Sequence, residues 1–451
     1  MNKIKLRFAP SPTGNLHIGN ARTLILNYIY SRSRSGEMLL RIDDTDSQRS
    51  DEKYTKSIIQ DIEWLDINCA ETHRQSTKIE RYKEISEHLI SKGRLYPCYE
   101  SDEELNRIRK LNLSRGKPPI YDRAALQLSK AQIDNYKSDG RKPYWRFLLD
   151  HHDIFWSDLI RGHQKIDCSS FSDPVLIRAD GSYLYSLPSV TDDIDMGITD
   201  VLRGEDHVSN TATQIQIFQA LGEKVPNFGH HSLMVLKDGS RMSKRDGAMS
   251  LSDIRSSGIE PMTLMNYCAR IGTSDSIEPY QKIDELASTY DLSKLSRAPA
   301  RFGFDELEAL NKKLLQNKSF ESVKDRLSEI GISDDNAKNF WNTIRTNINT
   351  IDEIRSWKDI IENDFEIDSI DKKLIQDAHD LLPNEPWDKN TWKSWTDLLS
   401  QKTGLTGKNL FLPLRIALTG RESGPELALF ILILGREKLL NRLKLHLGQV
   451  K

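Results

Sequence analysis

The first thirty residues change from a two-residue hydrophobic period to a helical one. Residues 3–8 alternate between basic and apolar side chains, which predicts a short strand. Two prolines and Gly14 then predict a turn. From Ile18 onward the apolar side chains take helical spacing, at Ala21, Leu24, Ile25, Tyr28 and Ile29. The sequence therefore predicts a strand, a turn and a helix in close succession.

Strands and helices continue to alternate along the first half of the chain. Glu37–Ile42 predicts a second strand, and the acidic run Asp43–Asp46 stands at its carboxyl end. Ile198–Leu202 predicts another strand, which ends on Arg203 and precedes a helix from Asn210 to Leu221. This alternation is typical of an α/β domain built on a parallel sheet.

Two further regions differ from this pattern. Residues 100–180 carry a basic helix, a Pro118-Pro119 break and short strands, and we interpret them as an insertion between two halves of the sheet. We expect the sheet to resume at Val175–Ile177 and Tyr183–Tyr185. Beyond Pro261 the spacing becomes helical, with apolar faces at Trp392, Trp395, Leu398 and Leu399, and at Leu427, Phe430, Ile431 and Leu434.

Composition narrows the class of protein. The chain has 451 residues, enough for about three domains at roughly 150 residues each. Its sequence shows neither an apolar run of the roughly 18 residues that a membrane span needs nor an N-terminal signal core. Four scattered cysteines without a Cys-x-x-Cys pair argue against structural zinc and favour the cytoplasm. A net charge of −2 predicts no overall basic surface, although nucleic-acid binding needs only a local one.

Three segments carry candidate chemistry, each with a simpler alternative. A turn that enters a helix at His17 and Gly19 suits a polyphosphate, but it also fits an ordinary strand–helix corner. The acidic run after Ile42 suits a ligand site, but Asp46, Ser47 or Ser50 could instead cap the next helix. Arg203 could hold a carboxylate or form an ion pair, and the basic loop 237–247 could close on phosphates or be solvated.

Together these segments resemble bacterial glutamyl-tRNA synthetases, which are class I aminoacyl-tRNA synthetases. The resemblance rests on the signature from Pro10 to Asn20, the strand end Arg41–Asp46, and the basic signature from Arg241 to Arg245. It extends through Asp192–His207 and Leu286–Phe302 to Leu414–Gly420, so it covers nearly the whole chain.

The resemblance implies a glutamate–tRNA ligase that forms glutamyl-adenylate from ATP and transfers glutamate to the terminal adenosine of tRNA. Its implied substrates and partners are glutamate, ATP with Mg²⁺, and tRNA-Glu, with tRNA-Gln left open as a second acceptor. It implies no membrane partner, and we expect a cytoplasmic monomer. The roles it implies are glutamate binding by Arg7, Ala9, Ser11, Asp43, Tyr185 and Arg203, ATP binding by His17, Gly19, Asn20, Ser243 and Lys244, and catalysis by His17, Lys244 and Arg245.

The chain departs from the family pattern at several positions. Asp43 replaces the usual glutamate, Arg241 replaces a lysine, and Ser189 stands where an asparagine often contacts the substrate. Many relatives hold zinc in the inserted domain through Cys-x-Cys and a second pair of ligands. Here Cys98 is followed by Tyr99 and Glu100, so we predict no zinc.

The implied architecture is α/β, with a Rossmann-type parallel-sheet catalytic domain, an inserted α+β acceptor-binding domain, and all-α stem-contact and anticodon-binding domains. We expect catalytic halves at 1–98 and 185–240, the insertion at 99–184, the stem-contact domain at 241–304 and the helical region, as two subdomains, at 305–451. The alternatives are a glutaminyl-tRNA synthetase and an inactive tRNA-binding paralogue. A truncated relative that modifies a tRNA base ends near the catalytic domain, whereas this chain continues well beyond it.

Overall fold

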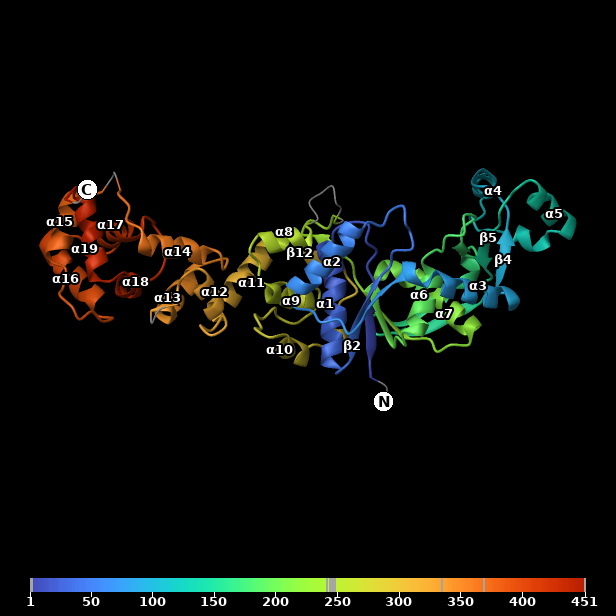
Figure 1. Cartoon of the computed structure of the whole chain (residues 1–451), viewed down its shortest axis with the longest axis horizontal. Helices are drawn as coiled ribbons and strands as arrows, with labels where there is room; N and C mark the ends of the chain where they lie inside the picture. Colours follow the sequence, from blue (N-terminus) through green and yellow to red (C-terminus); the bar gives the residue numbers. More distant parts are fainter. Residues whose placement is uncertain (1–2, 241, 243–248, 334–335, 368–369, 450–451) are drawn as a thin grey trace. The chain divides into compact units, whose positions relative to one another are not determined.

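The computed structural model describes residues 3–240, 242, 249–333, 336–367 and 370–449. The chain forms two compact units, coloured along the sequence in Figure 1. The first unit comprises Met1–Ser256 with Leu264–Gly303, and the second comprises Ser257–Thr263 with Phe304–Lys451. The chain therefore passes from one unit to the other three times, and the two units are described separately below.

The first unit is organised around parallel strands. One parallel sheet has the order β1 (Lys5–Phe8), β2 (Glu37–Ile42) and β3 (Thr72–Arg74), and a parallel pair joins β9 (Asp200–Gly204) to β10 (Asn227–His231). The amide of Thr199 donates to the Lys5 carbonyl at 2.9 Å, which places β9 beside β1. The carboxyl ends of these strands consequently meet at one edge, where ligands bind in open α/β sheets.

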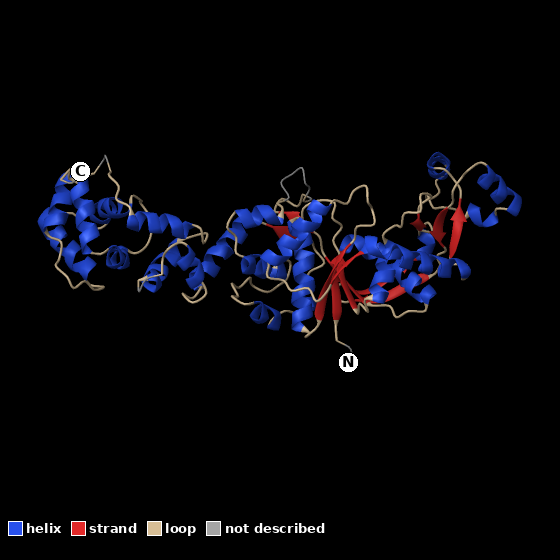
Figure 2. Ribbon diagram, in the orientation of Figure 1, coloured by secondary structure: helices blue, strands red, loops and turns tan. Residues whose placement is uncertain are grey.

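Helices connect and cover the strands, as Figure 2 shows. They are α1 (Ile18–Ser33), α2 (Glu52–Trp64), α3 (Ile79–Ser91), α6 (Ser186–Asp195) and α7 (Val208–Leu221). All five apolar positions predicted to face the core along α1 are buried. The predicted strand–turn–helix and the second strand are confirmed, because their apolar periods match the surfaces that they bury.

The segment between β3 and α6 contains two antiparallel sheets. One has the order β4 (Leu95–Cys98), β5 (Tyr144–Phe147) and β8 (Val175–Ile177), and the other is the hairpin β6 (Asp153–Asp158) and β7 (Gly162–Asp167). Helices α4 (Asp102–Ser114) and α5 (Lys130–Ser138) complete it.

The expected return to the parallel sheet at Val175–Ile177 is therefore wrong. These residues pair antiparallel with β5, and the predicted strand at Tyr183–Tyr185 forms only an isolated bridge at Tyr183, with Tyr185 at the start of α6. A three-residue apolar run has too little pattern to specify its partner strand.

The remainder of the first unit is mixed. Strand β11 (Met234–Leu236) pairs in parallel with β12 (Ala300–Phe302), and helices α8 (Leu251–Ser256), α9 (Pro261–Arg270) and α10 (Ile283–Ser288) lie between them in sequence. Helix α9 begins at Pro261, as predicted for a first-turn proline. The short 3-10 turns of the chain are Gln75–Lys78, Ala124–Gln127, Cys168–Ser170, Glu205–His207, Leu292–Lys294 and Arg345–Asn347.

The second unit is helical in the residues described. Its helices are α11 (Phe304–Asn317), α12 (Lys324–Glu329), α13 (Ala337–Ile344), α14 (Glu353–Glu362), α15 (Lys372–Asp380), α16 (Thr391–Thr403), α17 (Lys408–Thr419), α18 (Leu427–Leu434) and α19 (Arg436–His446). Trp341, Trp357 and Trp395 lie in one buried apolar cluster. All four predicted core positions of α18 are buried, whereas Leu398 of α16 is exposed. No described helix is both long and apolar enough to cross a membrane.

Candidate active site

A cavity of about 810 Å³ opens at the carboxyl ends of β1, β2 and β9. Its lining includes every residue predicted to bind glutamate and three of those predicted to bind ATP: Arg7, Ala9, Ser11, Asp43, Tyr185, Arg203, His17, Gly19 and Asn20. The other candidates, Ser243, Lys244 and Arg245, lie outside the described residues together with Arg241. The fold thus brings residues from distant parts of the sequence to one cavity, while their roles stay predictions.

The start of α1 forms one wall of this cavity through His17. The imidazole Nδ1 accepts hydrogen bonds from the amides of Gly19 at 3.1 Å and Asn20 at 3.3 Å. The Asn20 side chain accepts from the His17 amide in return, which completes a capping box. Because Nδ1 acts as an acceptor, a neutral ring carries its proton on Nε2, the nitrogen that can donate to a phosphate oxygen.

Gly19 leaves room for this position of the ring. A Cβ atom at residue 19 would lie 3.0 Å from both Cε1 and Nδ1 of His17, closer than ordinary van der Waals contact. The glycine therefore lets the imidazole fold back over the first turn of the helix.

The acidic run after β2 has two structural environments. Asp43 accepts hydrogen bonds from Arg41, at 2.6 Å from Nε and 3.1 Å from Nη2, and it lines the cavity. Asp44 accepts hydrogen bonds from the amide and hydroxyl of Ser76. Burial raises the pKa of Asp43, and the Arg41 charge opposes that increase. Asp43 is thus a carboxylate held rigidly on the cavity wall.

Helix α2 does not use the residues that the capping alternative named. Asp51 caps it by accepting a hydrogen bond from the Lys53 amide at 2.9 Å. The alternative that Asp46, Ser47 or Ser50 caps this helix is wrong, because the helix begins later, at Glu52. Asp46 instead pairs with Arg49.

Behind the cavity wall, α6 supplies a polar network that the sequence reading missed. Asp193 accepts from Arg7 Nε at 3.0 Å and from Arg41 Nη1 at 2.8 Å, so one carboxylate fixes both arginines. Burial alone would lower the pKa of Arg41, but Asp43 and Asp193 raise it well above its ordinary value. Ser189 is fully buried and accepts from Arg41 Nη2.

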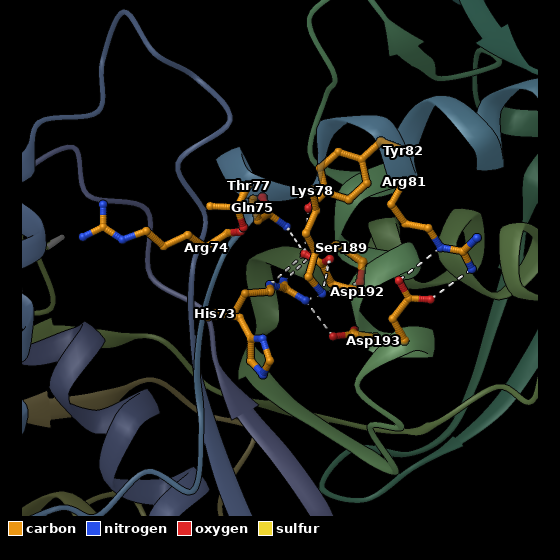
Figure 3. Close-up of polar contacts among 12 residues, drawn as sticks. His73, Arg74, Gln75, Thr77, Lys78, Arg81, Tyr82, Ser189, Asp192 and Asp193 are labelled. Carbon is orange, nitrogen blue, oxygen red and sulfur yellow. Dashed lines mark hydrogen bonds and ion pairs between the residues drawn. The ribbon is translucent and has the colours of Figure 1, made fainter.

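Asp192 connects α6 to α3 and to the turn that precedes α3. Figure 3 shows its carboxylate facing Gln75, Lys78 and Tyr82. Gln75 and Tyr82 donate to it at 2.9 and 3.0 Å, and the Lys78 ammonium lies 3.3 Å away. A signal for the network was present in the sequence, since Arg41 interrupts the apolar run from Met38 to Ile42, and Asp192 and Asp193 are adjacent acidic residues in α6.

Arg203, near the end of β9, has different surroundings from Arg41. Its guanidinium donates to Tyr185 Oη at 3.1 Å, Thr211 Oγ1 at 2.7 Å and His230 Nε2 at 3.2 Å. These acceptors are neutral, and burial lowers the pKa of Arg203. Within the described part of the chain, no Asp or Glu forms an ion pair with it. Arg203 is therefore a buried cation whose charge can be compensated by a bound anion.

Comparison with known proteins identifies the family. Residues 3–309 match the catalytic domain of class I tRNA synthetases (E and Q), and residues 308–447 match an anticodon binding domain. The chain belongs to the class I tRNA synthetases (E and Q).

Similar proteins match this class I synthetase over almost its whole length. A protein of Chelativorans sp. named glutamate–tRNA ligase 1 is 48% identical over 97% of this chain and 99% of its own. One of Beijerinckia indica named glutamate–tRNA ligase 2 is 48% identical over 98% and 99%. The fold also matches a crystal structure of a glutamate tRNA ligase from Elizabethkingia meningosepticum, with a TM-score of 0.86, 24% identity and full coverage of both chains.

In this class I synthetase, the segment between β3 and α6, called the inserted segment below, carries a hydrogen-bonded cluster at Cys98. Tyr121 and Tyr144 donate to the Glu100 carboxylate at 2.6 and 3.0 Å, and the Cys98 Sγ lies 3.8 Å from Tyr121 Oη. Burial raises the pKa of Cys98 to about 12, so this thiol is protonated at neutral pH. Among the described residues, no group of three or more His, Cys, Asp or Glu could hold a metal ion.

Proposed function

We propose that this synthetase activates glutamate with ATP and ligates it to tRNA. The observation that carries the proposal is the buried Arg203, which opens on the cavity with only neutral partners among the described residues. A buried guanidinium of this kind favours a substrate with a side-chain carboxylate over one with a neutral amide. The relatives named glutamate–tRNA ligase support the same substrate.

The cavity offers complementary groups for each charged part of glutamate. Arg203 and Tyr185 would bind the γ-carboxylate, and Asp43 would bind the α-ammonium group. Arg7, with Ala9 and Ser11 after it, lies on the same wall and suits the remaining α-carboxylate and backbone of the substrate. Fixing both ends of glutamate aims its α-carboxylate at the nucleotide, which lowers the entropic part of the barrier.

The chemistry needs no covalent intermediate on the protein. A glutamate α-carboxylate oxygen attacks the α-phosphorus of ATP, and the bond to the β-phosphate breaks to release pyrophosphate. A terminal ribose hydroxyl of tRNA then attacks the activated carbonyl carbon, and AMP leaves. In the first step His17 Nε2–H and the amides at the start of α1 would stabilise the phosphate charge. Lys244 and Arg245 are proposed to add charge from the basic loop.

ATP is expected to enter as its Mg²⁺ complex, with the ion neutralising phosphate charge. We further propose that the enzyme acts as a cytoplasmic monomer on tRNA-Glu. The Mg²⁺ complex follows from the charge of ATP, and the cytoplasmic location follows from a role in protein synthesis. Aminoacylation of purified tRNA-Glu and tRNA-Gln would determine whether one or both are acceptors.

The variant Arg203→Ala tests the proposal directly. It should lower kcat/KM for glutamate by about two to three orders of magnitude, because the γ-carboxylate loses its charged partner. The KM for ATP should change little. Unchanged glutamate use, or a wild-type enzyme that prefers glutamine, would contradict the proposed function.

A further inference from the structure

Two buried side chains lie behind Arg203 and are absent from the cavity lining. His230 on β10 is the direct strand partner of Arg203 on β9, and its Nε2 lies 3.2 Å from Arg203 Nε. On the other side of the ring, Nδ1 lies 2.5 Å from Asp158 Oδ2 at the end of β6. His230, Asp158 and Arg203 are each at least 95% buried. The three side chains therefore form a dry chain of hydrogen bonds that ends at the cavity.

The proton positions in this chain follow from the donors available. Arginine Nε–H is always a donor, so Nε2 of His230 must accept and the ring proton must lie on Nδ1. Nδ1–H then donates to the Asp158 carboxylate. Burial lowers the pKa of His230, which keeps the ring neutral. Burial alone would raise the pKa of Asp158, but hydrogen bonds from His230 and the Arg161 amide lower it to about 2.

Asp158 is itself fixed by the backbone. Its Oδ1 accepts from the amides of Ile160 at 3.0 Å, Arg161 at 2.9 Å and His230 at 3.1 Å. The Leu159 amide also donates to the Phe228 carbonyl on β10 at 2.8 Å. The β6–β7 hairpin of the inserted segment is thus anchored on the strand that carries His230.

We propose that His230, oriented by Asp158, is a positioning residue that aims Arg203 at the side-chain carboxylate and so sets the preference for glutamate over glutamine. The proposal rests on the proposed function. An arginine side chain loses rotamer entropy when it is ordered. The hydrogen bond from Nε to His230 orders the side chain before the substrate binds. Together with the hydrogen bonds to Thr211 and Tyr185, it fixes the plane of the guanidinium.

Substitutions at His230 can test the roles of its two ring nitrogens separately. Glutamine can place an amide oxygen near the position of Nε2, and asparagine can place an amide nitrogen near Nδ1. His230→Gln should therefore keep an acceptor for Arg203, while His230→Asn should lose it. We expect His230→Asn to raise the glutamate KM by about 10- to 100-fold, and His230→Gln to recover most of that loss.

Asp158→Asn is an almost isosteric change that tests the donor and acceptor roles in the hydrogen bonds from Arg203 through His230 to Asp158. Three amides donate to Oδ1, whereas Oδ2 accepts from His230 Nδ1 and, at 3.3 Å, from Trp156 Nε1, so the new NH₂ group is expected at the Oδ2 position, facing Nδ1 of His230. The ring would then carry its proton on Nε2, which faces the Arg203 Nε–H at 3.2 Å and Thr211 Oγ1 at 3.0 Å, so Arg203 Nε would lose its acceptor. A reversed tautomer behind a catalytic group is severely disruptive in other enzymes. We expect the glutamate KM to rise at least about 10-fold.

Asp173→Asn is the matched control. Asp173 is an equally buried carboxylate in the inserted segment, where it accepts from Tyr96 at 2.7 Å and Arg123 at 2.8 Å, and it does not line the cavity. This variant should lower the unfolding temperature without changing the glutamate KM.

The measurement is steady-state aminoacylation by the full-length enzyme at saturating tRNA, with glutamate and ATP varied separately and glutamine as competitor. The proposal predicts a higher glutamate KM and a smaller glutamate-to-glutamine ratio of kcat/KM, with the ATP KM and kcat within about threefold of wild type. An unchanged glutamate KM in Asp158→Asn or His230→Asn, or equal losses for ATP and glutamate, would overturn it. If Arg203→Ala still impairs glutamate use in that case, the proposed function stands, but His230 is not a positioning residue for it.

Discussion

Two buried arginines at this site differ in how their charge is compensated. Arg41 lies against the carboxylates of Asp43 and Asp193, whereas the side chains around Arg203 are neutral acceptors. The desolvation cost of the first is offset within the protein, whereas a bound anionic ligand would offset that of the second. The same residue type therefore has different surroundings in the two positions, and this difference supports the ligand-binding role proposed for Arg203.

Replacing Arg41 by alanine should therefore destabilise the fold strongly. It would leave Asp43, Asp192 and Asp193 buried close together without the central cation. We expect a loss of about 3–5 kcal/mol in urea unfolding, as for other broken buried ion pairs. Arg203→Ala, which removes a buried cation with no such partners, should lose much less stability, and equal losses in the two variants would contradict this contrast.

The buried carboxyl group of Asp61 on α2 should make the stability of the protein depend on pH. It is 1% exposed, and neither of its carboxylate oxygens accepts a hydrogen bond from the residues described, although Arg255 lies 3.9 Å away. Burial raises the pKa of Asp61 to about 6. A carboxyl group whose pKa rises on folding contributes its stability at low pH, and this is lost as pH rises through the folded value.

Asp61→Asn should consequently raise the free energy of unfolding at pH 7.5 by on the order of 1–3 kcal/mol, measured as a higher urea midpoint. At pH 4 the native carboxyl is already protonated, so the gain should largely vanish. A gain of the same size at both pH values would show that ionisation is not the cause.

At the scale of elements, the start of α1 combines a structural and a chemical role in one side chain. His17 caps the helix through Nδ1, while the proposed contact with phosphate uses Nε2. Asparagine is among the best helix caps but has no group at the Nε2 position. The two roles can therefore be separated by substitution.

His17→Asn should keep the stability of the wild type and lose adenylate formation, whereas His17→Ala should lose both. The expected stability difference between the variants is about 1 kcal/mol, the usual contribution of a cap. Thermal unfolding and pyrophosphate exchange in the presence of tRNA measure the two effects. Wild-type exchange in His17→Asn would remove the proposed phosphate contact.

At the scale of the molecule, catalytic and anticodon-binding regions belong to the two compact units, and the chain links them three times. The linking segment Ser257–Thr263 is bound into the second unit, where Glu260 pairs with Lys318 and Arg326 at 2.8 Å each. Several covalent connections between units allow binding energy in one to affect the other.

We therefore expect glutamate-dependent pyrophosphate exchange to stay near background until tRNA is added. The resemblance to glutamyl-tRNA synthetases suggests this coupling. Its physical basis would be induced fit, in which the energy of tRNA binding drives the conformational change that completes the site. A chain ending at Gly303 should lose the stimulation by tRNA. Rapid exchange by the full-length enzyme without tRNA would exclude the coupling.

The sequence by itself determined the elements with strong local patterns. The strand–turn–helix from Lys5 to Ser33, the strand Glu37–Ile42 and the core face of α18 follow from hydrophobic period and from prolines and glycines, which act locally. The motif resemblance also selected nine of the residues that line the cavity. Pattern and motif sufficed there because each acts within about twenty residues.

Only the tertiary structure decided which distant residues meet. Val175–Ile177 pairs with β5 instead of the parallel sheet, Asp193 joins Arg7 to Arg41, and Asp158 reaches Arg203 through His230. These partners are separated by tens to hundreds of residues, so no local period records them. A buried charge selects its partner by desolvation and hydrogen-bond geometry, and both exist only once the chain has folded.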